Sequence, residues 1–464
     1  MRKVLAVLLV IWMASLPAVA ARADGTDDHT LVVAALSAAT AHPKLEYAFF
    51  SRYPDGKIIY ISYGNLMYNS VQILAGLSPD IIHLDCGQIP RYANADVIEN
   101  LYENVFPDGY PEALAPQARH LMEYNNRMVG MAEHWNTYWW SIHLRYAEKL
   151  GYEIPEDGWT EQDLLDLYFN DYTGDTDGDG ELDVWFAPTA FYLDSEGLPV
   201  TRKAVYIGAY DAILAHATDL EYLLSEDFLA ELEFTRLLAT SDKLPTYVDE
   251  NGNYYPDNDY DAQLFNDRGY GYSGPYSGSA TENKRSSSLR ARISAPAFLN
   301  GEPNNYVSAG YYCLMRMAPH HELATEVMRM MGSEEYQALY NGLGYGGGNC
   351  FGAQEPVREL AYSGATNDWQ HITYSDEYHT DMRVVDASVL GKCHVKELAS
   401  YPDVYQAQLE LMAGLGNPFY DSLSLVEVCE TIFWPAFQQY CDENLTAEQV
   451  AHLLYQRLRI AMYE

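Results

Sequence analysis

The N-terminal part of the chain alternates short apolar runs with segments of helical periodicity. Residues 31–36, 57–63 and 80–84 are rich in apolar and branched side chains, which predicts three strands. Between them, residues 43–53 and 68–77 repeat apolar positions at helical spacing. Strands that alternate with helices at this spacing form a parallel sheet with crossover helices. The pattern therefore predicts an α/β fold.

The remaining pattern predicts a few strands and, toward the C-terminus, mainly helices. We expect strands at 127–133 and 306–317, and helices at 140–150, 159–167, 220–239 and 322–339. The last third is expected to be helical and to end in helices at 425–440 and 446–463. Thr160 and Thr446 are the expected N-caps and Gly151 the expected C-cap, because their side chains or conformational freedom suit helix ends.

The first residues read as an export signal. Arg2 and Lys3 precede a short apolar run at 4–16, and small residues at 18–23 offer cleavage sites. The run is too short to span a bilayer. We therefore expect residues 1–23 to be a signal peptide and the protein to be exported, extracellular or periplasmic, and associated with the cell envelope. The first cysteine is Cys86, so an N-terminal lipid anchor is not supported.

Charge and composition exclude some classes of partner. The chain has 464 residues, with 28 Lys+Arg against 66 Asp+Glu, and a formal charge of −38. So negative a chain repels phosphate backbones and anionic lipid, and nucleic acid is excluded as an expected partner. The 40 tyrosines are compatible with amphipathic packing throughout the fold or with a cleft whose rings stack on a ligand.

The six cysteines leave two alternatives open. Export permits disulfides, but none of the spacings is a C-x-x-C, and a chain of this size does not need cross-links to fold. A full disulfide framework and free or partly paired thiols are both compatible with the sequence, whereas the spacings disfavour structural zinc.

Five segments together resemble one family. They are Leu74–Asp85 with Tyr92-Ala93, the stretch from Trp140 to Thr160, Leu264–Tyr276, Ile293–Gln337 with its Asn300-Gly301 turn, and Phe433–Arg457. In this order they resemble the extracellular solute-binding proteins of ABC importers, in the family-1 group that includes maltodextrin-binding proteins. The resemblance covers nearly the whole chain after the signal peptide.

The resemblance implies a fold, a division into lobes and a role. The expected fold is the two-lobed type II periplasmic-binding-protein fold, an α/β architecture with two parallel-core sheets joined by hinge crossovers. Lobe 1 would hold residues 24–134 and 293–343, and lobe 2 residues 135–292 and 344–464. The expected role is capture of a sugar or oligosaccharide for ABC permease subunits by a monomer that is not an enzyme and needs no cofactor.

Candidate ligand-binding residues come from strand ends and from the resemblance. In parallel sheets, ligands bind beyond the carboxyl ends of the strands, which here points to residues near Ser37, Asp85 and His134. The full set is Ser37, Asp85, Gln88, Glu133, His134, Trp135, Tyr272, Tyr276 and Tyr345. Asp85 could instead cap the next helix. Maltodextrin-binding members carry an acid–base pair in the loop after the third strand, and the missing basic partner here argues against a maltodextrin ligand.

An acidic loop is a candidate for structural Ca²⁺. Asp175, Asp177, Asp179, Glu181 and Asp183 place carboxylates at alternate positions, which resembles the spacing of an EF-hand loop. Position 12 of that loop would be Phe186 instead of Glu, and a solvated acidic turn is the alternative.

Two other functions are alternatives to solute binding for an importer: a secreted enzyme, and a sensor or adhesin. A secreted carbohydrate-active enzyme would need paired carboxylates, and the sequence shows no recognisable acid–nucleophile pair. A sensor or adhesin built on the same fold is not separated from an importer component by sequence, because a fold does not fix a function.

Overall fold

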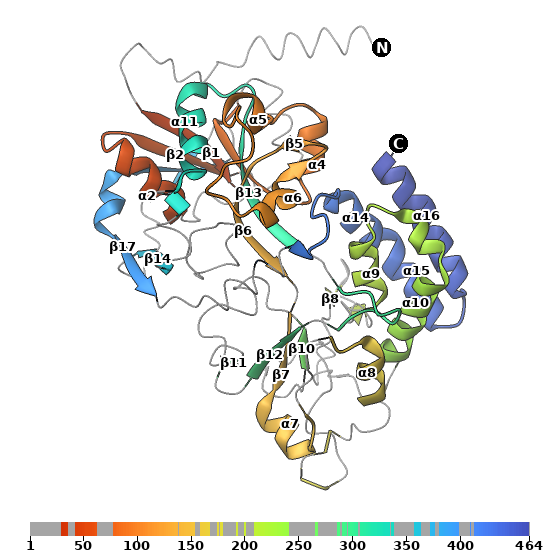
Figure 1. Cartoon of the computed structure of the whole chain (residues 1–464). Coiled ribbons are helices and arrows are strands. Elements are labelled where there is room, and N and C mark those ends of the chain that lie inside the picture. Colours follow the sequence, from red (N-terminus) through yellow and green to blue (C-terminus); the bar gives the residue numbers. More distant parts are fainter. Residues whose placement is uncertain are drawn as a thin grey trace, which may run out of the picture. The chain divides into compact units, whose positions relative to one another are not determined.

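The chain, in a computed structural model, divides into two compact units built from non-consecutive segments (Figure 1). Unit 1 comprises residues 1–134, 309–344 and 349–402, and unit 2 comprises 135–308, 345–348 and 403–464. The residues that the structure describes are 29–35, 42–62, 78–137, 139–153, 158–167, 174–175, 177–179, 192–193, 199–200, 208–240, 265–267, 285–287, 290–294, 296–304, 307–334, 336–337, 357–362, 372–375, 380–398, 409 and 413–463.

Unit 1 is built on a seven-stranded sheet in the order β15-β16-β2-β1-β3-β13-β6. Its strands are β1 (Thr30–Ala35), β2 (Lys57–Ser62), β3 (Ile81–Asp85), β6 (Met131–Thr137), β13 (Val307–Leu314), β15 (Ile372–Ser375) and β16 (Thr380–Asp386). β1 pairs in parallel with β2 and β3, as the sequence predicts, whereas β13 and β16 pair antiparallel with their neighbours β3 and β2. The predicted parallel core is thus confirmed at the centre of this sheet.

Helices and short ribbons complete unit 1. They are α2 (Pro43–Arg52), α4 (Ile89–Asn94), α5 (Leu101–Asn104), η1 (Pro116–Ala118), α6 (Arg119–Met122), α11 (His321–Met331), η6 (Ala387–Gly391), and the strand pairs β4–β5 (Glu123–Tyr124, Arg127–Met128) and β14–β17 (Val357–Tyr362, Cys393–Leu398). α11 shows why such helices form: Ala324, Val327, Met328 and Met331 recur at helical spacing and are all buried.

Unit 2 combines a four-stranded sheet with a group of helices. Its elements are β7 (Trp139–His143), α7 (Leu144–Leu150), α8 (Glu161–Asp166), β8 (Tyr192–Leu193), β9 (Pro199–Val200), α9 (Ala209–Ala215), η3 (Leu220–Leu224), α10 (Glu226–Ala239), β10 (Phe265–Asp267), β11 (Arg285–Ser287), β12 (Arg290–Ser294), α14 (Ser422–Val428), the π-helical turn η7 (Cys429–Phe433), α15 (Trp434–Cys441) and α16 (Ala447–Tyr463). The sheet order β10-β7-β12-β11 is antiparallel at every pairing, which differs from the expected parallel core.

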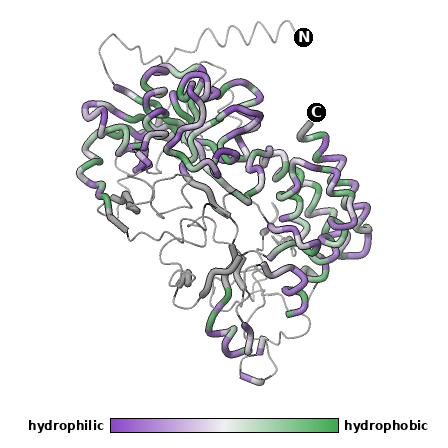
Figure 2. Tube along the Cα trace, viewed as in Figure 1, coloured by the Kyte–Doolittle hydropathy of each residue, from purple (hydrophilic) through white to green (hydrophobic). Residues whose placement is uncertain are grey.

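The core of unit 2 lies among its helices. Leu232 of α10, Phe433 of η7, and Leu454 and Leu458 of α16 are fully buried in one cluster with side chains of α9 and α14. Figure 2 shows hydrophobic and hydrophilic stretches alternating along these helices, as expected of helices with one buried face. Among the described residues, no helix combines the length and apolar composition that a membrane crossing requires.

The predicted helix ends are confirmed. Thr160 and Asp163 form a reciprocal capping box at the start of α8. Thr446 and Gln449 do the same before α16, with backbone-to-side-chain distances of 2.8 and 3.3 Å. Gly151 ends α7 with a φ of 76°, a conformation that glycine adopts without strain.

Several expectations are corrected by the structure. Residues 139–143 form strand β7, so the predicted helix 140–150 begins only at Leu144. The last third contains strands β14 to β17, where mainly helices were expected. The helix predicted at 68–77 lies outside the described residues. In both corrected regions, the pairing partners are distant in sequence, and periodicity carries no information about them.

The units group residues 293–308, residue 344 and residues 349–402 differently from the expected lobes. Residues 293–308 lie in unit 2, where β12 pairs with β7. Residues 349–402 belong with unit 1, because β16 pairs with β2. The first junction between the units lies between residues 134 and 135.

Candidate functional site

A polar cluster surrounds Glu133 in the sheet of unit 1. Its three strands lie side by side in the order β3, β13 and β6, and Tyr312 of β13 is opposite His83 of β3. The hydroxyl of Tyr312 donates to Glu133 Oε1 at 2.7 Å, and His83 Nε2 lies 2.8 Å from Glu133 Oε2. The sequence-predicted acid Glu133 is therefore held between a tyrosine and a histidine.

A second histidine joins the cluster from the loop before α2. His42 Nδ1 lies 2.8 Å from the Tyr312 hydroxyl oxygen, and its ring stacks on Tyr60 with centroids 5.2 Å apart. Since Tyr312 donates to Glu133, His42 must donate to the Tyr312 oxygen from Nδ1. Burial, then the charge of Glu133, raises the pKa of Tyr312 well above its usual value, so the phenol keeps its proton.

The two predicted ligand-binding residues after β3, Asp85 and Gln88, differ in their exposure to solvent. Asp85 ends β3 and is exposed. Gln88 is only 6 % exposed, and its Oε1 accepts the backbone N–H of Asp85 at 3.0 Å. The amide oxygen of Gln88 is thus used within the loop, whereas the Asp85 carboxylate faces solvent. Asp85 does not cap α4, because the N-cap position is Gln88 and shows no side-chain cap bond.

The other predicted ligand-binding residues are not all described. Ser37, Tyr272, Tyr276 and Tyr345 lie outside the described residues, and of His134 and Trp135 only the backbone, in β6, is described. Their roles stay predictions.

The acidic loop brings three of its five predicted ligands together. Carboxylate oxygens of Asp175, Asp177 and Asp179 all lie within 4.8 Å of one another. Asp175 Oδ1 accepts the backbone N–H groups of Asp177 at 3.2 Å and Gly178 at 2.6 Å, which fixes the turn. Such a set of hard oxygen donors suits Ca²⁺. Glu181 and Asp183 lie outside the described residues.

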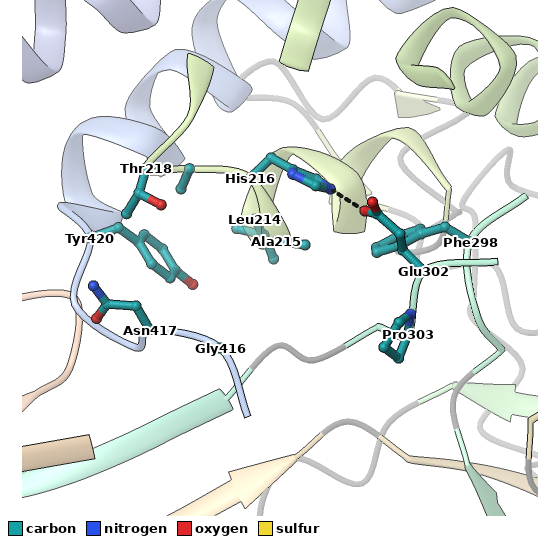
Figure 3. A pocket seen from close by; sticks show the side chains of 11 residues that line it. Leu214, Ala215, His216, Thr218, Phe298, Glu302, Pro303, Gly416, Asn417 and Tyr420 are labelled. Atoms are coloured by element: carbon teal, nitrogen blue, oxygen red, sulfur yellow. Dashed lines mark ion pairs between the residues drawn. The ribbon is translucent and has the colours of Figure 1, made fainter. Parts of the chain in front are cut away.

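A pocket of about 250 Å³ opens within unit 2 (Figure 3). It is lined by residues from the end of α9, from the turn after β12 and from the segment before α14: Leu214, Ala215, His216, Ala217, Thr218, Phe298, Glu302, Pro303, Gly416, Asn417 and Tyr420. Its volume lies a little below the roughly 300–1,000 Å³ typical of drug-sized ligands, so it suits a single small ring. Mostly apolar walls with a few polar groups are typical of small-molecule pockets.

His216 and Glu302 form the polar end of this pocket. His216 Nε2 lies 3.5 Å from Glu302 Oε2, and the imidazole stacks on Tyr222 with ring centroids 3.5 Å apart. Burial lowers the pKa of His216, which outweighs the opposing effect of Glu302. A neutral imidazole beside a carboxylate leaves the pocket with a negative charge, which favours neutral or cationic ligands over anions.

Sequence patterns carry little sign of these pocket residues. The Asn300-Gly301 turn is part of the family resemblance, and it shapes the loop that carries Glu302. His216 and Tyr420 stand in segments without a recognisable motif. They line one pocket only because α9 and the segment before α14 pack together.

Comparison with solved structures identifies the fold. An ABC substrate-binding protein from Listeria monocytogenes in complex with cycloalternan is 15% identical, with a TM-score of 0.53, and the match covers 94% of this chain and 99% of that one. A maltose/maltodextrin-binding domain from Bdellovibrio bacteriovorus bound to maltotriose is 14% identical, with a TM-score of 0.53 and coverage of 94% and 100%. A Rhizobium etli sugar transporter is 13% identical, with a TM-score of 0.57 and coverage of 93% and 99%.

The chain has the type II periplasmic-binding-protein fold. The predicted fold class is thereby confirmed over nearly the whole length. No protein-family model and no curated protein matches the sequence. The periplasmic-binding-protein fold is accordingly recognised through structure, at identities where only the architecture is shared.

Proposed function

We propose that this protein captures a neutral carbohydrate outside the cell and delivers it to an ABC importer. The observation that carries the proposal is the fold, because matched chains described as ABC substrate-binding and maltodextrin-binding proteins are covered almost end to end. On this proposal the chain is exported, works as a monomer with permease subunits and catalyses no reaction.

The described side chains support a neutral sugar. A pyranose ring has an apolar face, which apolar and aromatic walls bury, and hydroxyl groups that need polar partners. The unit 2 pocket supplies both, with Leu214 and Phe298 on its walls and Glu302, Asn417 and Tyr420 as polar neighbours. Unit 1, taken by itself, also carries carboxylates that can accept hydroxyl groups, the exposed Asp85 and the partly buried Glu133.

A thermal-shift screen tests this function. The ligands are cycloalternan, maltotriose, D-tagatose and D-mannitol, which are bound in matched structures, with amino acids and polyamines for comparison. A solute that binds only the folded state raises Tm by mass action, and at about 100 times Kd it adds about 2.7 kcal/mol. We expect a shift with at least one carbohydrate, confirmed by calorimetry.

Two outcomes would overturn the proposal. A shift with another solute class alone would reject the carbohydrate ligand. Chromatographic detection of products after incubation with the bound carbohydrate would show that the protein is an enzyme.

We also propose that the acidic loop binds a structural Ca²⁺ through Asp175, Asp177 and Asp179. Ca²⁺ should raise the Tm of the wild type, and the double variant Asp177→Ala, Asp179→Ala should lose this response. Asp55→Ala, which removes an exposed turn acid in unit 1, is the control and should respond as the wild type does. An undiminished Ca²⁺ response in the double variant would rule this loop out.

A further inference from the structure

Two glutamates, Glu161 and Glu231, lie in the interior of unit 2. Glu161 is the first residue of α8 and Glu231 lies within α10, and each is 1% exposed. Glu161 Oε1 accepts the backbone N–H of Gly208 at 2.9 Å, and Glu231 Oε1 accepts that of Leu299 at 2.9 Å. The second oxygen of each, Oε2, is buried and accepts no N–H or O–H from other described residues.

The two carboxyl groups lie near the same short segment, because the backbone N–H of Glu161 donates to Ala297 O at 2.9 Å and Leu299, two residues further on, donates to Glu231. Two ionised carboxylates have only acceptor atoms and repel each other, so their proximity in a buried site favours a proton on one of them. Burial is the largest cause that raises the pKa of both groups, and the contact with Glu231 raises that of Glu161 further. Geometry and burial therefore both favour the protonated form of one of the two carboxyls.

The charged neighbours of the pair reinforce this state. Asp211 of α9 raises the pKa of Glu161, and Asp227 in the first turn of α10 raises that of Glu231. Glu302, on the loop that follows Leu299, and Tyr222 of η3 also face this region, and burial and these acids raise the pKa of Tyr222. These charged neighbours are all acidic, and burial lowers the pKa of His216, which stacks on Tyr222 and lies 3.5 Å from Glu302. A shared proton would reduce the repulsion among these acids.

The pair also connects the two walls of the pocket. Glu161 holds Gly208 at the start of α9, and α9 ends at the pocket residues 214–218. Glu231 holds Leu299, which stands between the pocket residues Phe298 and Glu302. The far end of this loop is fixed to α9 as well, because Asn304 donates to Asp211 at 3.0 Å.

We propose that Glu161 and Glu231 share one proton and act as a clamp that holds both walls of the pocket in place, so that loss of this proton loosens the pocket. If the pocket binds the solute, the clamp would control the shape of the binding site. Only this link to solute binding rests on the proposed function. With the proton lost, two buried negative charges would face each other, and separating them would pull Gly208 and Leu299 apart.

The sign of the pH dependence follows from proton counting. Both glutamates ionise near pKa 4.3 in the unfolded chain, whereas the folded pair retains one proton above that pH. The folded state therefore binds more protons, and its stability falls as pH rises from about 4.3 toward the raised folded pKa. One proton of difference changes the folding equilibrium constant by about tenfold per pH unit within that window. The stability that the shared proton contributes is fully present below the pKa of the unfolded chain and is lost above the pKa of the folded pair.

Urea unfolding of the full chain across this pH window tests the clamp. Glu161→Gln keeps the shape and supplies an N–H donor to Glu231 without a titrating proton. The folding constant of this variant should fall with rising pH less steeply than that of the wild type. The difference between the two slopes should be about a factor of ten per pH unit. Glu226→Gln removes an exposed carboxylate from the same helix, α10, and should keep the wild-type slope. Equal slopes in Glu161→Gln and the wild type would overturn the proposal.

A spectroscopic readout keeps the proposal testable if Glu161→Gln does not fold. Infrared spectra of the folded wild type with ¹³C-labelled glutamate, recorded as pH rises above the ordinary glutamate pKa of about 4.3, should retain the carbonyl stretch of a protonated glutamic acid. Absence of that band would overturn the shared proton.

Hydrogen exchange then tests the link to the pocket without any solute. Protection factors at 214–218 and 298–304 should fall with rising pH in the wild type and stay level in Glu161→Gln. Unchanged protection in the wild type would reject the clamp. Because no carbohydrate is present, this failure is distinguishable from a failure of the carbohydrate screen.

Discussion

At the residue scale, Glu133 is where sequence and structure meet most directly. The family resemblance indicates a ligand-facing acid here, and the structure shows the Glu133 carboxylate between Tyr312 and His83, with a side chain that is 19% exposed. Its position on β6 follows from local pattern, but Tyr312 is 179 residues away in sequence. The residues that orient a candidate binding group were therefore beyond local sequence reasoning.

Removing the Tyr312 hydroxyl should destabilise unit 1. Tyr312→Phe leaves Glu133 Oε1 and His42 Nδ1 without this partner in a site where Tyr312 is fully buried. We expect the free energy of unfolding to fall by about 1–3 kcal/mol, measured by urea denaturation. Tyr124→Phe, whose hydroxyl bonds Asn94 at the surface, is the control and should change stability by less. A Tyr312→Phe protein as stable as the control would show that this network contributes little.

At the element scale, the local sequence pattern predicts most helices and strands correctly. The prediction is wrong where pairing with distant strands determines the secondary structure. Residues 139–143 carry two tryptophans and an isoleucine, which suit either a buried helix face or a strand. They form a strand because β7 lies between β10 and β12 and pairs with both. The helix ends at Gly151, Thr160 and Thr446 were predicted correctly, because capping depends on residues within one turn.

Two glycines at helix ends should differ in their tolerance of a side chain. Gly151 has a φ of 76°, and a Cβ added there would meet no atom within 4 Å, so Gly151→Ala should cost about 1–2 kcal/mol from backbone strain alone. At Gly208, with a φ of 64°, a Cβ would lie 2.5 Å from Thr235 Oγ1 and 2.7 Å from Phe234 Cδ1. Gly208→Ala should therefore cost about 3 kcal/mol or more.

Urea unfolding of both glycine variants measures the difference. Gly151→Ala is the matched control, because it makes the same substitution at a positive φ without the clash. Equal losses for the two variants would contradict the close packing of α9 on α10.

At the scale of the whole molecule, distant segments build each unit. β13 returns to pair with β3 in unit 1, and the C-terminal helices pack on α9 and α10 in unit 2. This packing also bears on the alternatives that the cysteines left open. Cys86, Cys313, Cys393, Cys429 and Cys441 carry thiols and form no disulfide with one another, and Cys350 lies outside the described residues.

The buried thiols should resist alkylation in the folded protein. Burial raises the pKa of Cys86 to about 11, and Cys86 is only 4% exposed, so at pH 8 it is protonated and shielded. We expect iodoacetamide to modify Cys86 and Cys313 only after unfolding, as detected by peptide mass spectrometry. Rapid modification of the native protein would contradict this burial. A reductant should leave Tm unchanged.

The α/β class, the central parallel strands, the helix caps and the family resemblance all follow from the sequence alone, because each depends on local spacing or on motifs in a fixed order. Tertiary packing was needed to establish which strands pair, how the chain divides into units, where the pocket lies and which acids face each other. Glu161 and Glu231 are 70 residues apart as numbered in the chain, and neither stands in a motif. Their chemistry arises from burial and proximity, which packing creates and local sequence does not encode.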